Sequence, residues 1–137
     1  MERPTLVRLL LGCAQCALLL CLPDQPVLAA PGPSGATLVA AARAQVGITL
    51  GYDGSYRRLD YPGGDVPIET GVCTDVVVRA FRILGVDLQV AVHEDMRAHF
   101  ARYPQHWGLR QPDRNIDHRR VPNLQTWLRR QGAALGA

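Results

Sequence analysis

Hydrophobic residues recur at helical spacing in four stretches of the chain. Residues that begin or end helices bound these stretches: Gly47 and Gly85 follow the first two, Asp87 precedes the third, and Pro122 begins the fourth. Within each stretch, apolar positions lie three or four residues apart, which is the period of one helix face. The pattern predicts helices over residues 36–46, 72–84, 88–103 and 122–131.

The second predicted helix has an apolar face and a charged face. Five residues share the apolar face and are expected to pack inward: Cys73, Val77, Ala80, Phe81 and Leu84. Three charged residues share the other face and are expected to point into solvent: Asp75, Arg79 and Arg82.

Two long segments show no sustained periodicity. Residues 48–71 and 104–120 carry glycine, proline and polar residues at turn-forming intervals. Long structured loops in compact domains tend to carry function. A short strand near residues 66–68 or 47–50 stays open. The predicted fold class is mainly α, with about four helices plus long loops.

The first 29 residues have the pattern of an export signal. A short basic start precedes an apolar run and ends at the small residues Ala29 and Ala30. The run is short for a bilayer span, so a cleaved signal is favoured over a retained anchor. We predict a signal peptide over residues 1–29, a linker over 30–36 and a domain over 37–137. The protein is expected in the periplasm or outside the cell, with no membrane association after cleavage.

Signal cleavage would leave Cys73 as the single thiol of the mature chain. The other cysteines, Cys13, Cys16 and Cys21, lie in the predicted signal. A disulfide scaffold and a cysteine-based zinc site are therefore excluded for the mature chain. A lone thiol in an exported protein is reactive, buried or available for an intermolecular bond.

Charge and histidine spacing exclude further classes of function. The formal net charge is +3, which is too small to argue for nucleic-acid binding. Residues 93–97 lack the second histidine of a zinc-protease helix, because Arg97 stands at that position. We expect no nucleic-acid partner, no metal and no cofactor, and the oligomeric state stays open.

Cys73 is placed at the start of the second predicted helix. A thiol there lies near unpaired backbone N–H groups and the positive end of the helix dipole, which stabilise a thiolate. Cysteine nucleophiles use this arrangement together with a nearby histidine base. The alternative is that Cys73 packs as a small apolar residue beside Val77 and Ala80.

The loop before Cys73 supplies candidate binding residues. Tyr52 and Tyr56 offer stacking surfaces, Asp53 offers an acceptor, and Arg57 can bind carboxylates. Tyrosines in turns also serve as anchors that fix a loop to the body of a protein, so both interpretations stay open.

Asp117 and His118 are further candidates for substrate binding, in the segment "NIDHRR". An Asp–His relay between them is disfavoured, since adjacent side chains seldom point the same way. The alternative is a polar loop whose side chains cap the following helix.

Four stretches together resemble a known family: "YDGSYRRLDYPGGDVP", "GVCTDVVVRAFRILGVDLQ", "VHEDM" and "NIDHRRVPNL". They resemble the exported bacterial proteins with domain of unknown function 1287, over about residues 40–127. That family is similar to the NlpC-type and papain-like cysteine peptidases. The resemblance implies that Cys73 occupies the nucleophile position. It also implies that the family domain continues into a β-sheet bearing the histidine base, so this chain corresponds to the helical part of an α+β domain.

The leading hypothesis is a cell-envelope cysteine amidase or peptidase that acts on peptidoglycan or wall peptides. None of the four histidines corresponds to the family's base, so the chain as it stands is expected to be inactive or nearly so. The alternatives are a non-enzymatic envelope binding module and a fragment without independent function.

Overall fold

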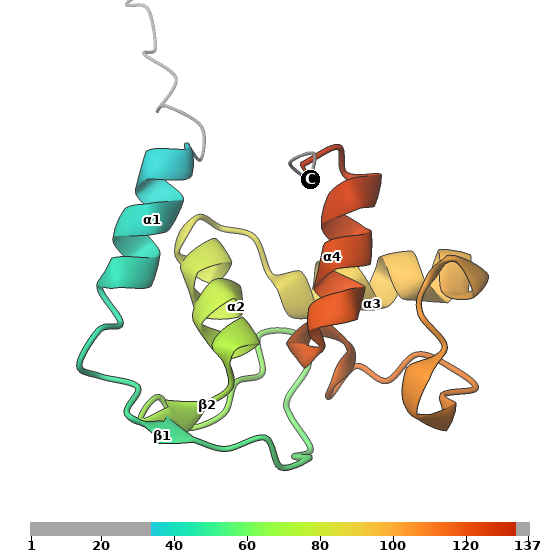
Figure 1. Ribbon diagram of the computed structural model, residues 1–137, viewed down its shortest axis with the longest axis horizontal. Helices are drawn as coiled ribbons and strands as arrows, with labels where there is room; N and C mark the ends of the chain where they lie inside the picture. The colour runs from blue at the N-terminus through green and yellow to red at the C-terminus, as the bar shows by residue number, and fades with distance from the viewer. Residues whose placement is uncertain (1–33, 134–137) are drawn as a thin grey trace, which may run out of the picture. The chain divides into compact units, whose positions relative to one another are not determined.

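The computed structural model describes residues 34–133, and within them helices dominate (Figure 1). The α-helices are α1 Gly35–Arg43, α2 Cys73–Ile83, α3 Leu88–His99 and α4 Val121–Arg130. Three short 3₁₀ helices connect them: η1 Phe100–Arg102, η2 His106–Gly108 and η3 Asp117–Arg119. The mainly α prediction is confirmed.

Helix α1 begins with a reciprocal cap at Ser34. The Thr37 N–H donates to the Ser34 hydroxyl at 3.2 Å, and the Ser34 N–H donates to the Thr37 hydroxyl at 3.1 Å. The first two helical residues therefore fall inside the predicted linker. The helix ends at Arg43, about one helical turn before the predicted end at residue 46. Hydrogen-bonded turns follow it and include Gly47, which has a φ of 81°.

Helices α2, α3 and α4 enclose the hydrophobic core. Figure 1 shows α3 running across and behind α4, while α1 lies beside α2. The core consists of buried apolar residues from these helices and from the segment after α3: Val78, Leu88, Val92, Met96, Tyr103 and Leu124. Helical spacing brings these side chains to the inner faces.

The predicted faces of α2 are wrong in part. Asp75 and Arg79, which were expected in solvent, are buried, whereas Cys73 and Val77 are exposed. The charged residues can be buried because residues from other segments pair with them. Their partners lie far away in the sequence, so helical periodicity alone did not reveal the burial.

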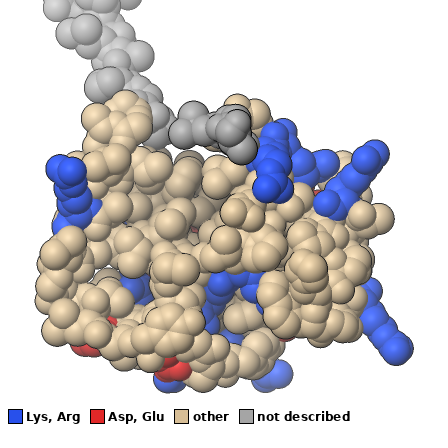
Figure 2. Space-filling view, viewed as in Figure 1, with Lys and Arg blue, Asp and Glu red and all other residues tan. Residues whose placement is uncertain are grey.

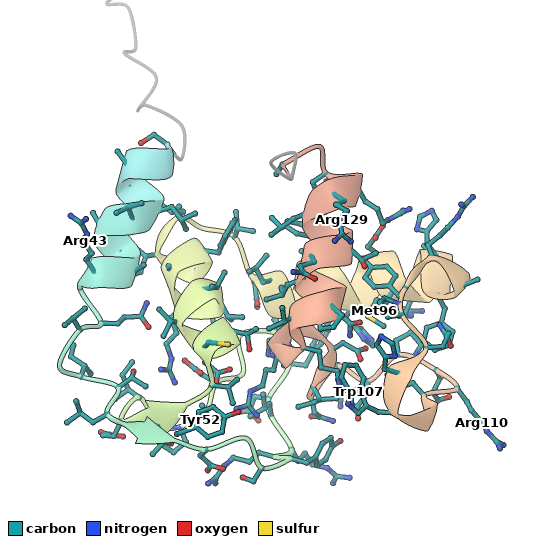
Figure 3. All side chains as sticks on the ribbon, in the orientation of Figure 1. Arg43, Tyr52, Met96, Trp107, Arg110 and Arg129 are labelled. Carbon is teal, nitrogen blue, oxygen red and sulfur yellow. The ribbon has the colours of Figure 1, made fainter. Side chains whose placement is uncertain are left out.

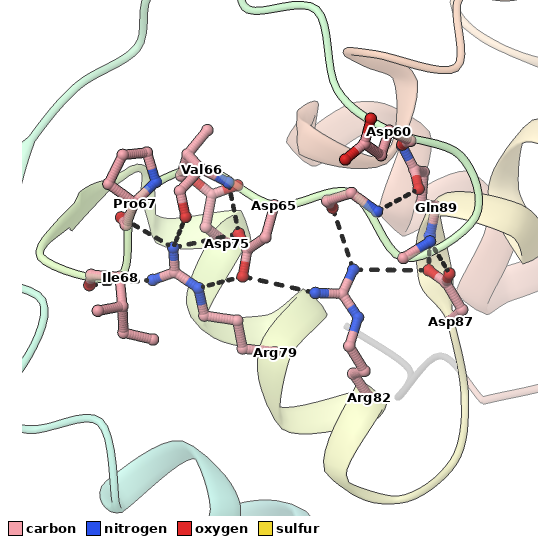
Figure 4. A network of polar contacts seen from close by, with 12 residues as sticks. Asp60, Asp65, Val66, Pro67, Ile68, Asp75, Arg79, Arg82, Asp87 and Gln89 are labelled. Carbon is pink, nitrogen blue, oxygen red and sulfur yellow. Dashed lines mark hydrogen bonds and ion pairs between the residues drawn. The ribbon is translucent and has the colours of Figure 1, made fainter.

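Arg79 holds the irregular segment before α2 in place (Figure 4). Its guanidinium donates to the Asp65 carboxylate at 2.8 and 3.1 Å. The same guanidinium donates to the backbone carbonyls of Val66 at 3.1 Å and Thr70 at 3.3 Å. A single buried side chain thus satisfies carbonyl groups that lack a regular ladder.

Two short strands lie next to the N-terminal end of α2. Strand β1, Gly51–Tyr52, pairs in parallel with β2, Thr70–Gly71, with Gly51 opposite Thr70. Both strands lie just after the two positions that the sequence left open, and they pair with each other. Pairing of β1 with β2 brings Tyr52 close to the segment that leads into α2.

Parts of the predicted domain organisation lie outside the described residues. These parts are the signal peptide over residues 1–29, the start of the linker and the last four residues of the chain. Among residues 34–133, none of the helices has the length and the apolar run that crossing a bilayer requires.

Candidate functional site

Cys73 is the first residue of α2, and its side chain is exposed. Gly71 lies two residues before Cys73, and its φ of 153° favours glycine. A Cβ atom at Gly71 would lie 2.6 Å from Oδ2 of Asp75, so the close approach also requires glycine. The alternative in which Cys73 packs as an apolar core residue is not what the structure shows.

Asp75 fixes the first turn of α2 behind Cys73. Its Oδ2 accepts a hydrogen bond from the Val72 N–H at 2.7 Å, which satisfies one of the free donors at the helix start. Its two oxygens also accept from Arg119 at 2.8 and 2.9 Å, and both side chains are buried. Hydrogen bonding to Asp75 raises the pKa of Arg119 above its usual value.

Arg119 also joins this helix start to residues 52–57, the tyrosine loop, which carries Tyr52 and Tyr56. Its guanidinium donates to the backbone carbonyls of Ser55 at 3.3 Å and Asp53 at 3.4 Å. The Thr74 hydroxyl donates in turn to the Arg119 carbonyl at 2.8 Å. The loop, η3 and the first turn of α2 are therefore held together around Cys73.

Cys73 lines a pocket of about 540 Å³. Its walls come from the tyrosine loop, the start of α2, η2, η3 and the start of α4, and its lining includes Tyr52, Tyr56, Cys73, Trp107, Arg119 and Arg120. Figure 3 shows Tyr52 near the N-terminal end of α2 and Trp107 near that of α4. The structure thus brings two predicted binding residues, Tyr52 and Tyr56, into one pocket with Cys73.

Trp107 is the most unusual residue of this pocket. It has a φ of 60°, which is rare for a bulky side chain, and it is 58% exposed. The guanidinium carbon of Arg120 lies 4.4 Å from the centre of the indole ring, within the range of a cation–π contact. The mouth of the pocket therefore carries an exposed aromatic ring with a guanidinium stacked on it.

A second, smaller hollow of about 230 Å³ adjoins Cys73. Strand β1 and the preceding residues line it, together with Val76 of α2. Leu50 and Tyr52 at its edge are 81% and 84% exposed. Cys73 therefore borders two hollows.

Asp53 and Arg57 pair with each other instead of lining the Cys73 pocket. The Arg57 guanidinium lies 2.7 Å from Oδ2 of Asp53. Hydrogen bonds from Ser55, followed by those from Arg57, hold the pKa of Asp53 well below its usual range. Both residues stay candidates for substrate binding, although they lie on the tyrosine loop outside the pocket lining.

Asp117 and His118 are buried, with exposed fractions of 0% and 2%. Burial raises the pKa of Asp117 to about 6 and lowers that of His118 to about 4. Neither residue lines the Cys73 pocket. The Asp117 carboxylate accepts from the Asp113 N–H, so it stabilises its own loop and not the start of α4, contrary to the capping alternative.

The described part of the chain places no histidine in the Cys73 pocket. His93 lines a different pocket, and burial lowers its pKa. His99 and His106 are exposed. Residues 34–133 also contain no group of three acidic, histidine or cysteine side chains placed to hold a metal ion.

Sequence reasoning missed four residues of this site. Trp107, Arg119 and Arg120 line the pocket, and Asp75 supports it. The position of Asp75, three residues after the helix cap, is a capping signal that could have found it. The arginines and the tryptophan follow no local pattern, because the pocket assembles only when distant loops meet.

The first comparison with known proteins concerns families. A family model described as "Domain of unknown function (DUF1287)" matches residues 39–137, which is most of the chain. The chain belongs to the DUF1287 family. All the pocket residues named above lie inside the matched range.

The DUF1287 chain also has a curated relative, "Uncharacterized protein YijF" of Escherichia coli strain K12. The two are 65% identical over 89 residues, which is 65% of this chain and 43% of the relative. The chain thus spans less than half of the length of that protein. No solved structure matches the chain.

Proposed function

We propose that this DUF1287 chain carries the nucleophile and the acyl-binding pocket of a cell-envelope cysteine amidase or peptidase. The observation that carries the proposal is the exposed Cys73 thiol at the start of α2, inside a pocket with aromatic walls. The apolar pattern of residues 1–29 supports export, and peptidoglycan or wall peptides are the proposed substrates.

The reaction proposed for this pocket begins with attack of the Cys73 thiolate on the acyl carbon of an amide. The S–C bond forms, and the carbonyl oxygen becomes an oxyanion. Free backbone N–H groups in the first turn of α2 are suited to stabilise both anions. The C–N bond then breaks, the amine takes up a proton, and water hydrolyses the thioester.

Proton delivery to the amine needs a general acid, and the described residues that line the pocket include no histidine, aspartate or glutamate for that role. Activated esters avoid this requirement, because their leaving groups depart as anions. We therefore expect the chain to form a thioester with activated esters readily, and to hydrolyse amides very slowly.

The test is acylation of the purified chain by the p-nitrophenyl ester of N-acetylalanine, mapped by trypsin digestion and mass spectrometry. Cleavage after arginine places Cys73 alone on peptide 59–79, whereas Cys13, Cys16 and Cys21 share peptide 9–43. We expect the acyl group on peptide 59–79 and its loss in Cys73→Ala. Acylation absent from this peptide, or unchanged p-nitrophenol release in Cys73→Ala, would refute the proposal.

A second candidate function is non-enzymatic binding of wall glycan or peptide. The observation that favours this alternative is the set of exposed aromatic rings that line the pocket: Tyr52, Tyr56 and Trp107 are 84%, 60% and 58% exposed. Such rings stack on sugars and peptides. Trp107→Ala should weaken sedimentation with wall fragments, whereas Ile83→Ala, at an exposed residue outside the pocket, should not. Equal sedimentation of wild type and Trp107→Ala would refute this alternative.

A further inference from the structure

The lining of the Cys73 pocket carries positive charge and no carboxylate. Arg119 and Arg120 both line it, and no aspartate or glutamate is among the lining residues that the structure describes. Figure 2 shows basic side chains inside a recess in the lower half of the face drawn, and further basic side chains at the edges of this face. The chemistry of the lining therefore favours an anionic group over a cationic one.

The two arginines differ in what already neutralises them. Arg119 forms two short hydrogen bonds with the buried Asp75 carboxylate. Arg120 forms a looser ion pair: its Nη1 lies 4.0 Å from Oδ1 of the buried Asp117, which is too long for a hydrogen bond. Arg120 is thus the lining arginine with hydrogen-bond donors available for a ligand.

The geometry of Arg120 holds it ready for such a ligand. Its guanidinium stacks on Trp107, and its side chain is only 18% exposed. Within residues 34–133 its guanidinium forms no hydrogen bond: Nη1 is buried and faces Asp117, so Nε and Nη2 are the donors left for a ligand. A carboxylate oxygen is the strongest acceptor for a guanidinium.

We propose that Arg120, stacked on Trp107, binds a carboxylate of the substrate in the Cys73 pocket. The substrate class is then acidic peptides that carry a carboxylate close to the acyl group that Cys73 attacks. This inference rests on the proposed function for the reaction, but the binding of the carboxylate can be tested without it.

The test compares two alkylating reagents that differ by one charge, iodoacetate and iodoacetamide. In both reactions the thiolate sulfur bonds to the methylene carbon, the C–I bond breaks and iodide leaves, while the thiol proton goes to the buffer. The rate at Cys73 is followed on tryptic peptide 59–79. The ratio of the two rates is divided by the same ratio for the neutral thiol N-acetylcysteinamide, which removes intrinsic reactivity.

We expect this normalised ratio to exceed one in the wild type and to fall roughly threefold to tenfold in Arg120→Gln. Arg129→Gln is the matched control, because Arg129 is exposed on α4 and lies outside the pocket while the change in net charge is the same (Figure 3). Raising the salt concentration should lower the wild-type ratio toward that of Arg120→Gln. Equal falls in both variants would overturn the proposal.

Circular dichroism would reveal a folding defect in Arg120→Gln, and in that case a second variant tests the same site. Trp107→Leu removes the ring on which the guanidinium stacks and should lower the ratio by a smaller factor. A wild-type ratio of one would overturn the carboxylate site even if no variant folded.

Failure of this inference is distinguishable from failure of the proposed function. Thioester formation with the neutral ester tests Cys73 as an acyl acceptor and does not involve Arg120. If the ester acylates Cys73 and the alkylation ratio is one, the carboxylate site is wrong and the nucleophile stands. If the ratio responds to Arg120→Gln and no thioester forms, the carboxylate site stands and the proposed reaction is wrong.

Discussion

Two buried polar clusters lie next to the Cys73 pocket, and they differ in how completely they are paired. The Asp75 cluster consists of Thr74, Asp75 and Arg119, whose hydrogen bonds are short and reciprocal. The Asp117 cluster consists of Asp117, its sequence neighbour His118, and three residues that approach Asp117: His93, Arg120 and Asn123. Each member of the second cluster has a buried side-chain atom without a hydrogen-bond partner within residues 34–133.

The clusters meet along the backbone of η3, where Arg119 belongs to the first and its two neighbours belong to the second. A fully paired cluster holds one arrangement, because each group would lose its partner if it moved. Such a fixed arrangement is suited to holding the Cys73 thiol in place. The unpaired cluster keeps donors and acceptors for water, and of its members only Arg120 lines the Cys73 pocket. One short segment, η3 with the residue after it, therefore joins a fully paired support to a less completely paired interior.

The largest expected effect comes from breaking the paired cluster. Arg119→Met leaves the Asp75 carboxylate buried without its cation, and loss of one partner of a buried pair destabilises a protein by about 3–5 kcal/mol. The free energy of unfolding should fall by that amount, measured by urea titration. Because the tyrosine loop also depends on Arg119, the loop should become more sensitive to proteolysis.

Arg57→Met is the matched control, since it removes an arginine from an exposed pair with Asp53. The free energy of unfolding should change little, because solvent screens exposed pairs. If both variants lost the same stability, the contrast between a supporting pair and a surface pair would be wrong.

The second prediction concerns the pH dependence of the Asp117 cluster. The pKa of Asp117 is raised to about 6 in the folded state, so this group stabilises the fold as pH falls from 6 to 4. The pKa of His118 is lowered to about 4, so this group destabilises the fold as pH falls from about 6.5 to 4. The two contributions oppose each other and nearly cancel in the wild type.

Single substitutions should reveal each contribution. In Asp117→Asn, the free energy of unfolding should fall with decreasing pH by up to about 1.4 kcal/mol per unit more than in the wild type. In His118→Gln the difference from the wild type should have the opposite sign. Urea titrations at pH 4, 5, 6 and 7 measure both. Parallel pH profiles of wild type and both variants would show that burial does not shift these groups.

Much of the fold followed from the sequence, because hydrophobic periodicity and helix end signals act locally. The four helices lie where the apolar residues recur, although α1 is shorter than predicted. The faces of α2 could not be derived in the same way. Asp75 and Arg79 are buried only because Arg119 and Asp65, distant in sequence, compensate their charges.

Residues of the site could be predicted where the local sequence indicates their role, and they could not be predicted where their position depends on distant contacts. Cys73 at a helix start and the tyrosines of an irregular loop were visible in the sequence, and the structure places Cys73, Tyr52 and Tyr56 in one pocket. Trp107 and Arg120 were missed, since their stacking depends on contact between η2 and the start of α4. The roles of all these residues stay predictions.

The smallest predicted effect separates the hydrogen bonds of the Asp75 cluster from its ion pair. Thr74→Val keeps the shape of the side chain and removes the hydroxyl that donates to the Arg119 carbonyl. The buried carbonyl then lacks that donor, so the free energy of unfolding should fall by about 1–2 kcal/mol. Thr74→Ser keeps the hydroxyl and should retain more of the stability, since it loses only a methyl group. If the urea midpoint of unfolding of Thr74→Val equalled that of the wild type, the Asp75–Arg119 ion pair alone would stabilise the start of α2. The Thr74 hydroxyl would then have no part in supporting Cys73.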